Sequence, residues 1–275
     1  DESFSKRDIT LNNTEVVRKG YYFSTSASDS IEVDNSSDFN FGTDDFTIEA
    51  WINYSSFTEN DGIIGMHDGS SSNRLNLYIA ESGGVKKFFF MYVKSGSVLA
   101  GYRFGAPSQG EWNHVAICRD SNGWRFYVNG VEDTSPQTFN GTGYSSNADF
   151  SGLTSGPFIG KTYNGDFHGY ISDVRISKGS ARYTADFDEV VTTKDSNHKL
   201  ILTGEATDQS DSGHSLTFSG AHPTAKYGQG SFYFDGGSSS FITVPKDSSM
   251  SYANKSFAME AWVMLEDYPS SYGAI

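Results

Sequence analysis

Four side chains in this sequence have a chemistry and a position suited to sugar recognition. Tyr144 and Tyr163 lie in segments rich in Gly and Asn, His168 follows shortly after, and Trp124 stands at a predicted strand end. Sugar sites combine polar loop groups with an exposed aromatic ring, since the ring packs against C–H groups while the hydroxyls are hydrogen-bonded. We therefore expect these four residues to bind a ligand, with a glycan as the first candidate.

The other three tryptophans are interpreted as structural. Trp51, Trp112 and Trp262 each stand in or beside a segment with the alternation of a strand. The core of a β-sandwich commonly contains large aromatic side chains. We therefore expect them in the core rather than at a ligand.

Catalytic patterns are absent from the sequence. It contains no Gly-x-Ser-x-Gly motif, no glycine-rich phosphate loop and no Cys/His spacing for zinc. His67, Asp68 and His114 have no obvious nucleophile nearby in the sequence, so surface or hydrogen-bonded core histidines are the simpler interpretation. We expect a protein that is not an enzyme.

Charge and hydropathy restrict the partners. The formal net charge is −14, and affinity for nucleic acids or anionic membranes depends on clustered Lys and Arg. A nucleic acid partner is therefore not expected. No apolar run reaches transmembrane length, so insertion into a membrane is not expected either. Cys118 is the single cysteine, so intramolecular disulfides are excluded. We interpret it as a small buried hydrophobic residue.

The elements that would position these residues are β-strands. In 46–53 the apolar Phe46, Ile48, Ala50 and Ile52 alternate with more polar neighbours, which is the period of a strand with one face on a core. Further segments with strand character are 21–23, 31–33, 63–64, 75–79, 88–93, 98–104, 112–119, 124–128, 158–159 and 169–176. Tight turns are predicted at 83–84, 121–123 and 129–130. The spacing favours an all-β antiparallel sandwich.

The sequence repeats itself. Trp51 and Trp262 are 262 − 51 = 211 positions apart, and the same offset aligns 22–51 with 233–262 without a gap. The chain should therefore hold tandem copies of one module, the second incomplete, and we expect it to be a piece of a longer protein.

The segment before the first copy has its own counterpart. Residues 1–14 resemble 208–221 at an offset of 216 − 9 = 207, and the apolar strand 200–202 precedes only the second segment. The first module then lacks its opening strand, which leaves a sheet edge to be filled from elsewhere. We expect domains at 1–190 and 198–275, joined by a linker at 191–197.

These segments, in this order, resemble the concanavalin A-like, laminin G-like jelly roll, the superfamily that also holds pentraxins. The resemblance spans 1–190 and the beginning of a second copy. The motifs that carry it are FTIEAWI at 46–52, EWNHVAI at 111–117, WRFYVNG at 124–130, FIG at 158–160 and GYISDVRISKGSARY at 169–183. It implies an antiparallel jelly-roll β-sandwich and leaves the ligand open.

The resemblance also implies two kinds of acidic site. Glucanases of this superfamily place carboxylates on one strand in a Glu-x-Asp-x-x-Glu pattern. Here Glu32-x-Asp34 and Glu59-x-Asp61 lack the second Glu, and Glu49, repeated as Glu260, stands alone in its strand. A glycoside hydrolase with atypical carboxylates is therefore an alternative only.

Calcium is the cofactor that the pentraxin-like members suggest. Calcium takes about six to eight oxygen ligands from loops. The matching positions are Asn60 and Asp61 in one loop, with Asn164 and Asp166 in another, although Lys161 departs from the acidic pattern. Ordinary Asn-Gly and Asp-Gly turns are the alternative interpretation.

The segment 176–187 is similar to tails of such domains in bacteriophage structural proteins and large bacterial surface proteins. We interpret it as a lid, in which Tyr183 and Phe187 pack on the sandwich and Arg175 or Arg182 contacts a carboxylate. We expect a non-catalytic recognition or adhesion module of an extracellular protein or of a virion-surface protein, associated with a phage tail or capsid. Its partner would be a glycan or a neighbouring structural subunit. A purely structural spacer domain in a large bacterial adhesin is the alternative.

Overall fold

The computed structural model describes residues 10–12, 14–17, 20–24, 29–141, 144–188, 190, 192–219, 221–223, 231–234 and 241–243. The chain divides into two compact units, one of Val17–Ser231 and one of Asp1–Val16 with Phe232–Ile275. The predicted second strand pattern with Glu260 and Trp262 lies outside the described residues. The tandem copies therefore stay a prediction.

The larger unit holds two eight-stranded sheets. The order in the first sheet is β12 (Val131–Glu132), β11 (Gly123–Val128), β10 (Asn113–Asp120), β5 (Phe46–Tyr54), β15 (Gly169–Lys178), β3 (Tyr21–Phe23) and β18 (His222–Pro223), and β16 (His198–Leu202) also pairs with β15. The order in the second is β13 (Gln137–Thr138), β9 (Ser97–Phe104), β8 (Val85–Lys94), β7 (Arg74–Ser82), β6 (Asn60–His67), β14 (Phe158–Ile159), β4 (Ser30–Val33) and β17 (Leu216–Ser219). A short 3-10 helix, η1, spans Ser37–Phe39.

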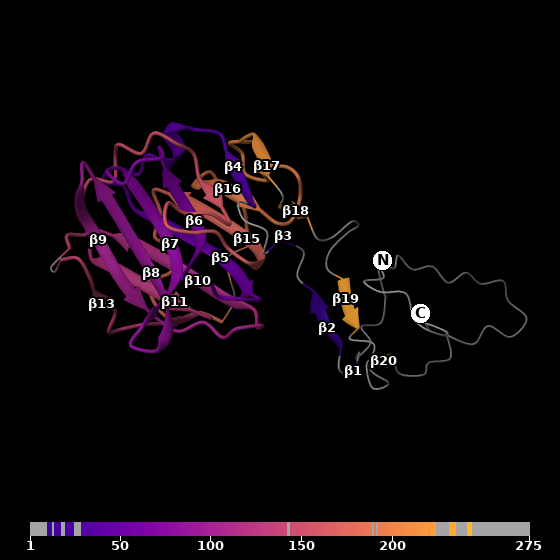
Figure 1. Ribbon diagram of the computed structural model, residues 1–275. Helices are drawn as coiled ribbons and strands as arrows, with labels where there is room; N and C mark the ends of the chain where they lie inside the picture. Colours follow the sequence, from indigo (N-terminus) through magenta and orange to yellow (C-terminus); the bar gives the residue numbers. More distant parts are fainter. Residues whose placement is uncertain are drawn as a thin grey trace, which may run out of the picture. The chain divides into compact units, whose positions relative to one another are not determined.

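The two sheets lie face to face and bury the core between them, with β7, β8 and β9 in one layer and β5, β10 and β11 in the other (Figure 1). Ile48 and Ile52 of β5 and Phe88 and Phe90 of β8 are fully buried in this core. Neighbouring strands pair antiparallel. The predicted all-β antiparallel sandwich is therefore confirmed, and its architecture is consistent with a jelly roll.

Glycine and asparagine at positive φ form two of the predicted turns. Gly83 and Gly84, with φ of 64° and 78°, join β7 to β8, and Asn129 and Gly130, with φ of 50° and 80°, join β11 to β12. Two successive positive φ values define the hairpin turn that matches the twist of the strands, and these residue types adopt them at low cost. The turns predicted at 83–84 and 129–130 are therefore present.

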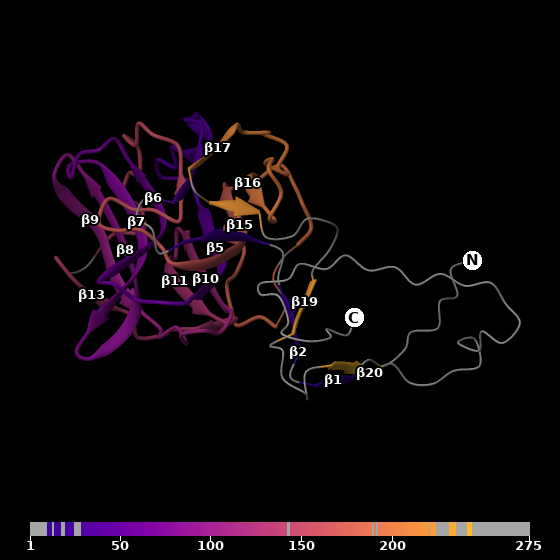
Figure 2. The same ribbon diagram turned by 45° about the vertical axis from the view of Figure 1, so that its right-hand side comes forward.

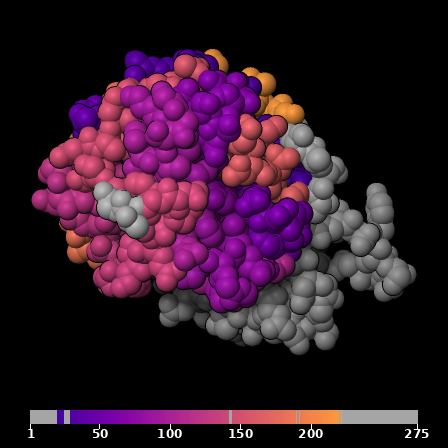
Figure 3. All heavy atoms as spheres, turned by 60° about the vertical axis from the view of Figure 1, so that its left-hand side comes forward, coloured from indigo at the N-terminus to yellow at the C-terminus, as the bar shows by residue number. Residues whose placement is uncertain are grey.

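The long loop between β13 and β14 closes one end of the core. Its Phe150 is fully buried and stacks on Tyr92 with ring centroids 3.9 Å apart. In the space-filling view this loop is part of the pink area next to the magenta atoms (Figure 3). An irregular loop thus contributes a core residue that alternation cannot identify.

The segment 198–219, expected to open the second module, is built into the sandwich of the first. β16 pairs with β15 along Val174–Ser177 (Figure 2), and β17 pairs with β4 (Figure 1). Leu200 and Leu202 are fully buried. The larger unit therefore extends to Ser231, beyond the expected boundary at 190, because β16 occupies the sheet edge that the sequence left open.

Among its described residues, the smaller unit contains the strand pair of β1 (Thr10–Asn12) and β20 (Phe241–Thr243). It also contains all but the last residue of β2 (Thr14–Val17) and all but the first residue of β19 (Ser231–Phe234), which pair with each other.

Candidate functional site

The outer face of the first sheet carries a group of partly exposed aromatic rings. Trp51 of β5, Tyr170 of β15 and Tyr22 of β3 alternate with core residues on their strands, so all three point away from the core. Tyr22 and Tyr170 lie with ring centroids 5.0 Å apart, and Trp112, just before β10, lies 6.4 Å from Tyr170. We call Tyr22, Trp51, Trp112 and Tyr170 the aromatic face.

The other half of this outer surface is covered by the segment 180–187. Tyr183 and Phe187 stack on each other at 3.8 Å and contact Tyr127 at 5.9 and 5.4 Å. This is the lid that the sequence predicted. It explains why Thr47 and Glu49, on the outward side of β5, are fully buried although alternation places them away from the core.

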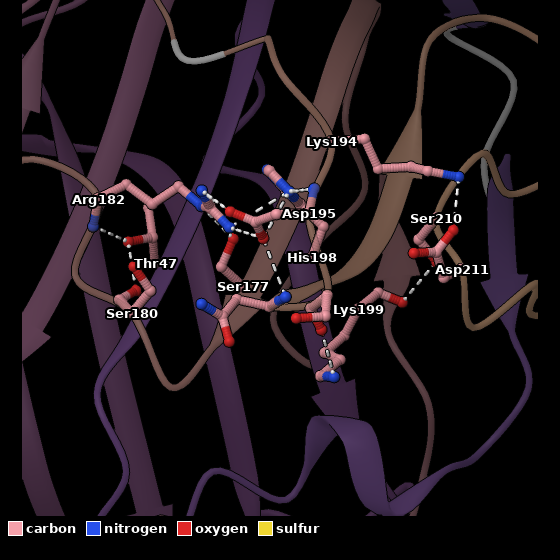
Figure 4. A network of polar contacts seen from close by, with 12 residues as sticks. Thr47, Ser177, Ser180, Arg182, Lys194, Asp195, His198, Lys199, Ser210 and Asp211 are labelled. Atoms are coloured by element: carbon pink, nitrogen blue, oxygen red, sulfur yellow. Dashed lines mark hydrogen bonds and ion pairs between the residues drawn. The ribbon is translucent and has the colours of Figure 1, made fainter.

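A polar network holds the lid to the sandwich (Figure 4). Arg182 forms a bidentate ion pair with Asp195 at 2.9 and 2.6 Å, and its Nε donates to Ser177 Oγ at 2.7 Å. Thr47 Oγ1 donates to the Ser180 carbonyl and accepts from the Arg182 amide. The hydrogen bonds from Arg182 hold the pKa of Asp195 far below its usual range. The predicted contact between lid arginine and carboxylate is thus present.

Glu49 lies beneath the lid and has no exposed surface. Its Oε2 accepts a hydrogen bond from the Tyr183 hydroxyl at 2.8 Å and lies 3.1 Å from His114 Nε2. A glycosidase carboxylate has to reach the scissile bond. In this conformation Glu49 fastens the lid and has no access to a substrate.

A depression of about 190 Å³ lies where the aromatic face meets the lid. Apolar walls come from Trp51, Trp112 and Phe187, and polar groups come from His114, Asn129, Gly130 and Asp188, with Val190 completing the lining. The Asn129–Gly130 hairpin turn is held here because Asn129 Oδ1 accepts from the His114 amide at 2.7 Å. Aromatic walls with a few fixed polar groups are a suitable surface for one sugar ring.

Two of the predicted ligand residues have structural contacts. Trp124 packs against Phe46, Phe90 and Phe150 with centroid distances of 5.9, 5.6 and 5.5 Å. Tyr144 donates its hydroxyl to the Phe139 carbonyl at 2.6 Å and is partly buried. Both rings contact Tyr102, so they form one packing cluster at the second sheet.

Tyr163 is the predicted ligand residue with the greatest exposure, at 41 %. The Arg74 guanidinium lies 4.9 Å from its ring centroid, and the His67 ring meets it edge-on at 5.8 Å. An exposed tyrosine beside a cation and an imidazole is a second, smaller surface on which a polar ligand can be bound.

The two predicted calcium loops do approach each other. The backbone at Gly165 lies so close to that at Asn60 that a Cβ atom on Gly165 would fall 2.0 Å from the Asn60 carbonyl oxygen. Asp61 is fully buried, however, and its Oδ1 accepts from Thr58 and lies 3.7 Å from His168 Nδ1. His168 is thus a partner of Asp61.

Asn164 and Asp166 belong to the facing turn, in which Lys161 and Asp166 form an isolated bridge and the Asn164 amide donates to Thr162 Oγ1. Within the described part of the chain, no three His, Cys, Asp or Glu side chains gather as a metal site requires. Calcium binding at these loops stays a prediction.

Substituting Asp61 tests that prediction. Burial raises the pKa of Asp61, so in the pH window between the unfolded and folded pKa values the native state binds the extra proton and stability falls as pH rises. Asp61→Asn keeps the acceptor for Thr58 and removes the buried charge. We expect it to unfold about 2–4 °C higher at pH 7 and to lose this pH dependence, measured by thermal melts. A calcium ion at Asp61 would instead give wild-type protein a calcium-dependent rise that Asp61→Asn lacks.

Sequence reasoning missed the aromatic face because it assigned Trp51 and Trp112 to the core. Both are partly exposed and line the depression. A usable signal was present: in 46–53 Trp51 occupies the polar register of the alternation, opposite in phase to Ile48, Ala50 and Ile52.

Comparison with known proteins agrees with this architecture. Residues 25–183, more than half of the chain, match the family described as the concanavalin A-like lectin/glucanases superfamily. No curated protein matches the chain in sequence. No helix in the described residues is long and apolar enough to cross a membrane.

Three solved structures illustrate the similarity. A Bacteroides ovatus protein to which carbohydrate binding is attributed has 21 % identity and a TM-score of 0.49, over 77 % of this chain and 62 % of its own. The tailspike protein 2 of bacteriophage CBA120 has 15 % identity and a TM-score of 0.41, over 65 % of this chain and 30 % of its own. The SAP-like pentraxin of Limulus polyphemus has 14 % identity and a TM-score of 0.45, over 77 % and 94 %. Because this similarity is distant, the ligand of this chain has to be inferred from its own residues.

Proposed function

This chain belongs to the concanavalin A-like lectin/glucanases superfamily, and on that premise we propose that it is a non-catalytic module that binds glycans through its aromatic face. The supporting observation is the set of partly exposed rings of Tyr22, Trp51, Trp112 and Tyr170 on the half of the sheet beside the lid. Rings so arranged present apolar surface to the C–H faces of successive sugars.

The depression beside Trp51 and Trp112 supplies the polar part of the proposed site. Asn129, His114 and Asp188 line it, and Asn129 is fixed by its hydrogen bond with the His114 amide. Side chains held before the ligand arrives lose little entropy on binding. A volume of about 190 Å³ suits one sugar unit, with further units extending over Tyr170 and Tyr22.

We expect Trp112→Ala and Trp51→Ala each to weaken glycan binding about 10- to 100-fold, because one stacked ring contributes roughly 1–3 kcal/mol. A glycan array identifies the ligand, and calorimetry on the best glycan gives the affinities. Tyr163→Ala, at the exposed tyrosine beside Arg74, is the matched control and should bind like wild type. Thermal melts of each variant show whether the fold is retained.

Other outcomes would decide against this proposal. Loss of binding in Tyr163→Ala alone would move the site to the Tyr163–Arg74 surface. An array without signal, both with and without calcium, would favour a structural spacer or a protein partner. Binding that requires calcium would point to Asn60, Asp61, Asn164 and Asp166.

The proposal of a non-catalytic module rests on the environment of Glu49, which is buried and bonded to Tyr183. We expect no release of reducing sugar from β-glucans or from any glycan that binds. Hydrolysis by wild-type protein that Glu49→Gln abolishes would establish an enzyme.

We also propose an extracellular or virion-surface setting, with adhesion as the task. The segment 176–187, which includes the lid and is similar to tails in phage and bacterial surface proteins, supports this setting. Immunogold labelling of particles and cell envelopes tests it, and label confined to the cell interior would reject it.

A further inference from the structure

Two strand pairs in different units of this chain share one register. β17 pairs with β4 so that Thr217 lies opposite Glu32, and β1 pairs with β20 so that Thr10 lies opposite Thr243. The sequence offsets relate these positions, since 217 − 207 = 10 and 32 + 211 = 243. The two neighbouring pairs in β1 and β20 obey the same rule. The two units therefore make the same pairing with corresponding segments.

A second pair of strands follows the same relation. β18 pairs with β3, with His222 opposite Tyr22. By the same offsets, His222 corresponds to position 222 − 207 = 15, which lies in β2, and Tyr22 corresponds to position 22 + 211 = 233, which lies in β19. β2 and β19 are paired. The opening segment of the second predicted copy, with β17 and β18, therefore pairs with strands β4 and β3 of the first copy. The opening segment of the first copy, with β1 and β2, pairs with strands β20 and β19 of the second.

The segment 198–219 is held by internal hydrogen bonds and by contacts with the first predicted copy. Asp208 accepts hydrogen bonds from the amides of Ile201, Ser210 and His214 at 3.0, 2.8 and 3.0 Å. His214 in turn lies 2.9 Å from an oxygen of Asp34, and its ring lies 4.7 Å from that of Phe39. The contacts to Asp34 and Phe39 fasten the opening segment of the second predicted copy to the first sandwich.

From this equivalence we propose that neighbouring repeats exchange strands. The edge formed by β15, β3 and β4 is an interaction surface, and its partner is the opening segment, 198–223, of a second copy of the repeat. The segment 10–17 is the corresponding donor for a copy that contains the 231–243 edge. Each repeat is then completed by its neighbour, so that consecutive repeats are joined by sheet hydrogen bonds as well as by the covalent chain.

The alternative is local pairing, in which each opening segment pairs with the strands that directly follow it. The register would then place Thr10 opposite Glu32 and leave Thr217 to pair elsewhere. Thr217 and Glu32 are both exposed, so cysteines at these positions leave the core intact. Residues directly opposite in antiparallel strands have Cα atoms within the range that a disulfide bridges.

The experiment compares two double variants of the full chain under mild oxidation. Glu32→Cys with Thr217→Cys should lose both new thiols to one disulfide, mapped by peptide mass spectrometry, whereas Glu32→Cys with Thr10→Cys should keep both free. The native Cys118 does not interfere, because it is fully buried and burial raises the pKa of its thiol to about 11. A disulfide between positions 10 and 32, with none between 217 and 32, overturns the exchange.

Thr10→Cys with Thr243→Cys is the third variant. A disulfide between these positions, within one molecule or between two, supports the exchange, and two free thiols there count against it. Glycan binding is not part of the readout, so failure of the exchange and failure of the proposed function are separable.

Discussion

A chain shortened to 1–197 is expected to lose cooperative folding. It would lack β16, whose Leu200 and Leu202 are fully buried and whose Ile201 is 5 % exposed. Each such side chain contributes roughly 2–5 kcal/mol, so the loss of three equals the whole net stability of a typical domain, roughly 5–15 kcal/mol. The edge of β15 would also lose its backbone partners. Far-UV circular dichroism and urea titration measure the effect.

The control is a chain of 17–231, which retains the complete larger unit and should unfold in one transition. A milder test in the full chain is Leu202→Ala, expected to cost about 2–5 kcal/mol. A 1–197 chain that unfolds cooperatively with wild-type stability would show that β16 belongs to the following module, and would also weaken the proposed strand exchange.

Replacing Arg119 with alanine is expected to cost about 4 kcal/mol. Arg119 is 1 % exposed and donates to the carbonyls of Ala148, Gly42 and Asp44. Its guanidinium also lies 4.7 Å from the ring centroid of Phe150. Burial lowers its pKa to about 10, so the side chain remains charged at neutral pH. Alanine would leave a cavity and three carbonyls without their donor, each costing roughly 1 kcal/mol or more.

Two further substitutions separate these causes. Arg119→Met fills the space but donates nothing, so we expect about 3 kcal/mol lost in urea unfolding, less than for alanine. Arg119→Lys keeps a charge but lacks the planar fork that reaches three carbonyls, and should be intermediate. Wild-type stability in Arg119→Met would show that packing alone matters at this position.

The sequence by itself determined which face of each long strand meets the core. Ile48 and Ile52 are buried, as the alternation of β5 predicts. Arg119 lies on the same side of β10 as the buried Val115 and Ile117, so the alternation of that strand also predicts its burial. The hairpin at Asn129 and Gly130 was equally readable, because only a few residue types adopt positive φ at low cost.

Only the tertiary structure decided what covers the opposite faces. The lid buries Glu49 and stops short of Trp51, so one strand carries a buried carboxylate and a partly exposed indole in the same phase. Trp124, interpreted as a ligand residue, is partly buried and packs against the core and against Phe150 of the loop between β13 and β14. Alternation distinguishes the two sides of a strand and carries no information on which later segment of the chain folds over either side.

The pairing of the opening segments was also undetermined by sequence. Thr217 and Thr10 lie in corresponding segments, and either segment satisfies the register at Glu32. Local pattern assigns both the same strand, and the choice between them depends on loop closure and on contacts such as those of Leu200 and Leu202 with the core. Those contacts are long-range, and therefore they exist only in the folded chain.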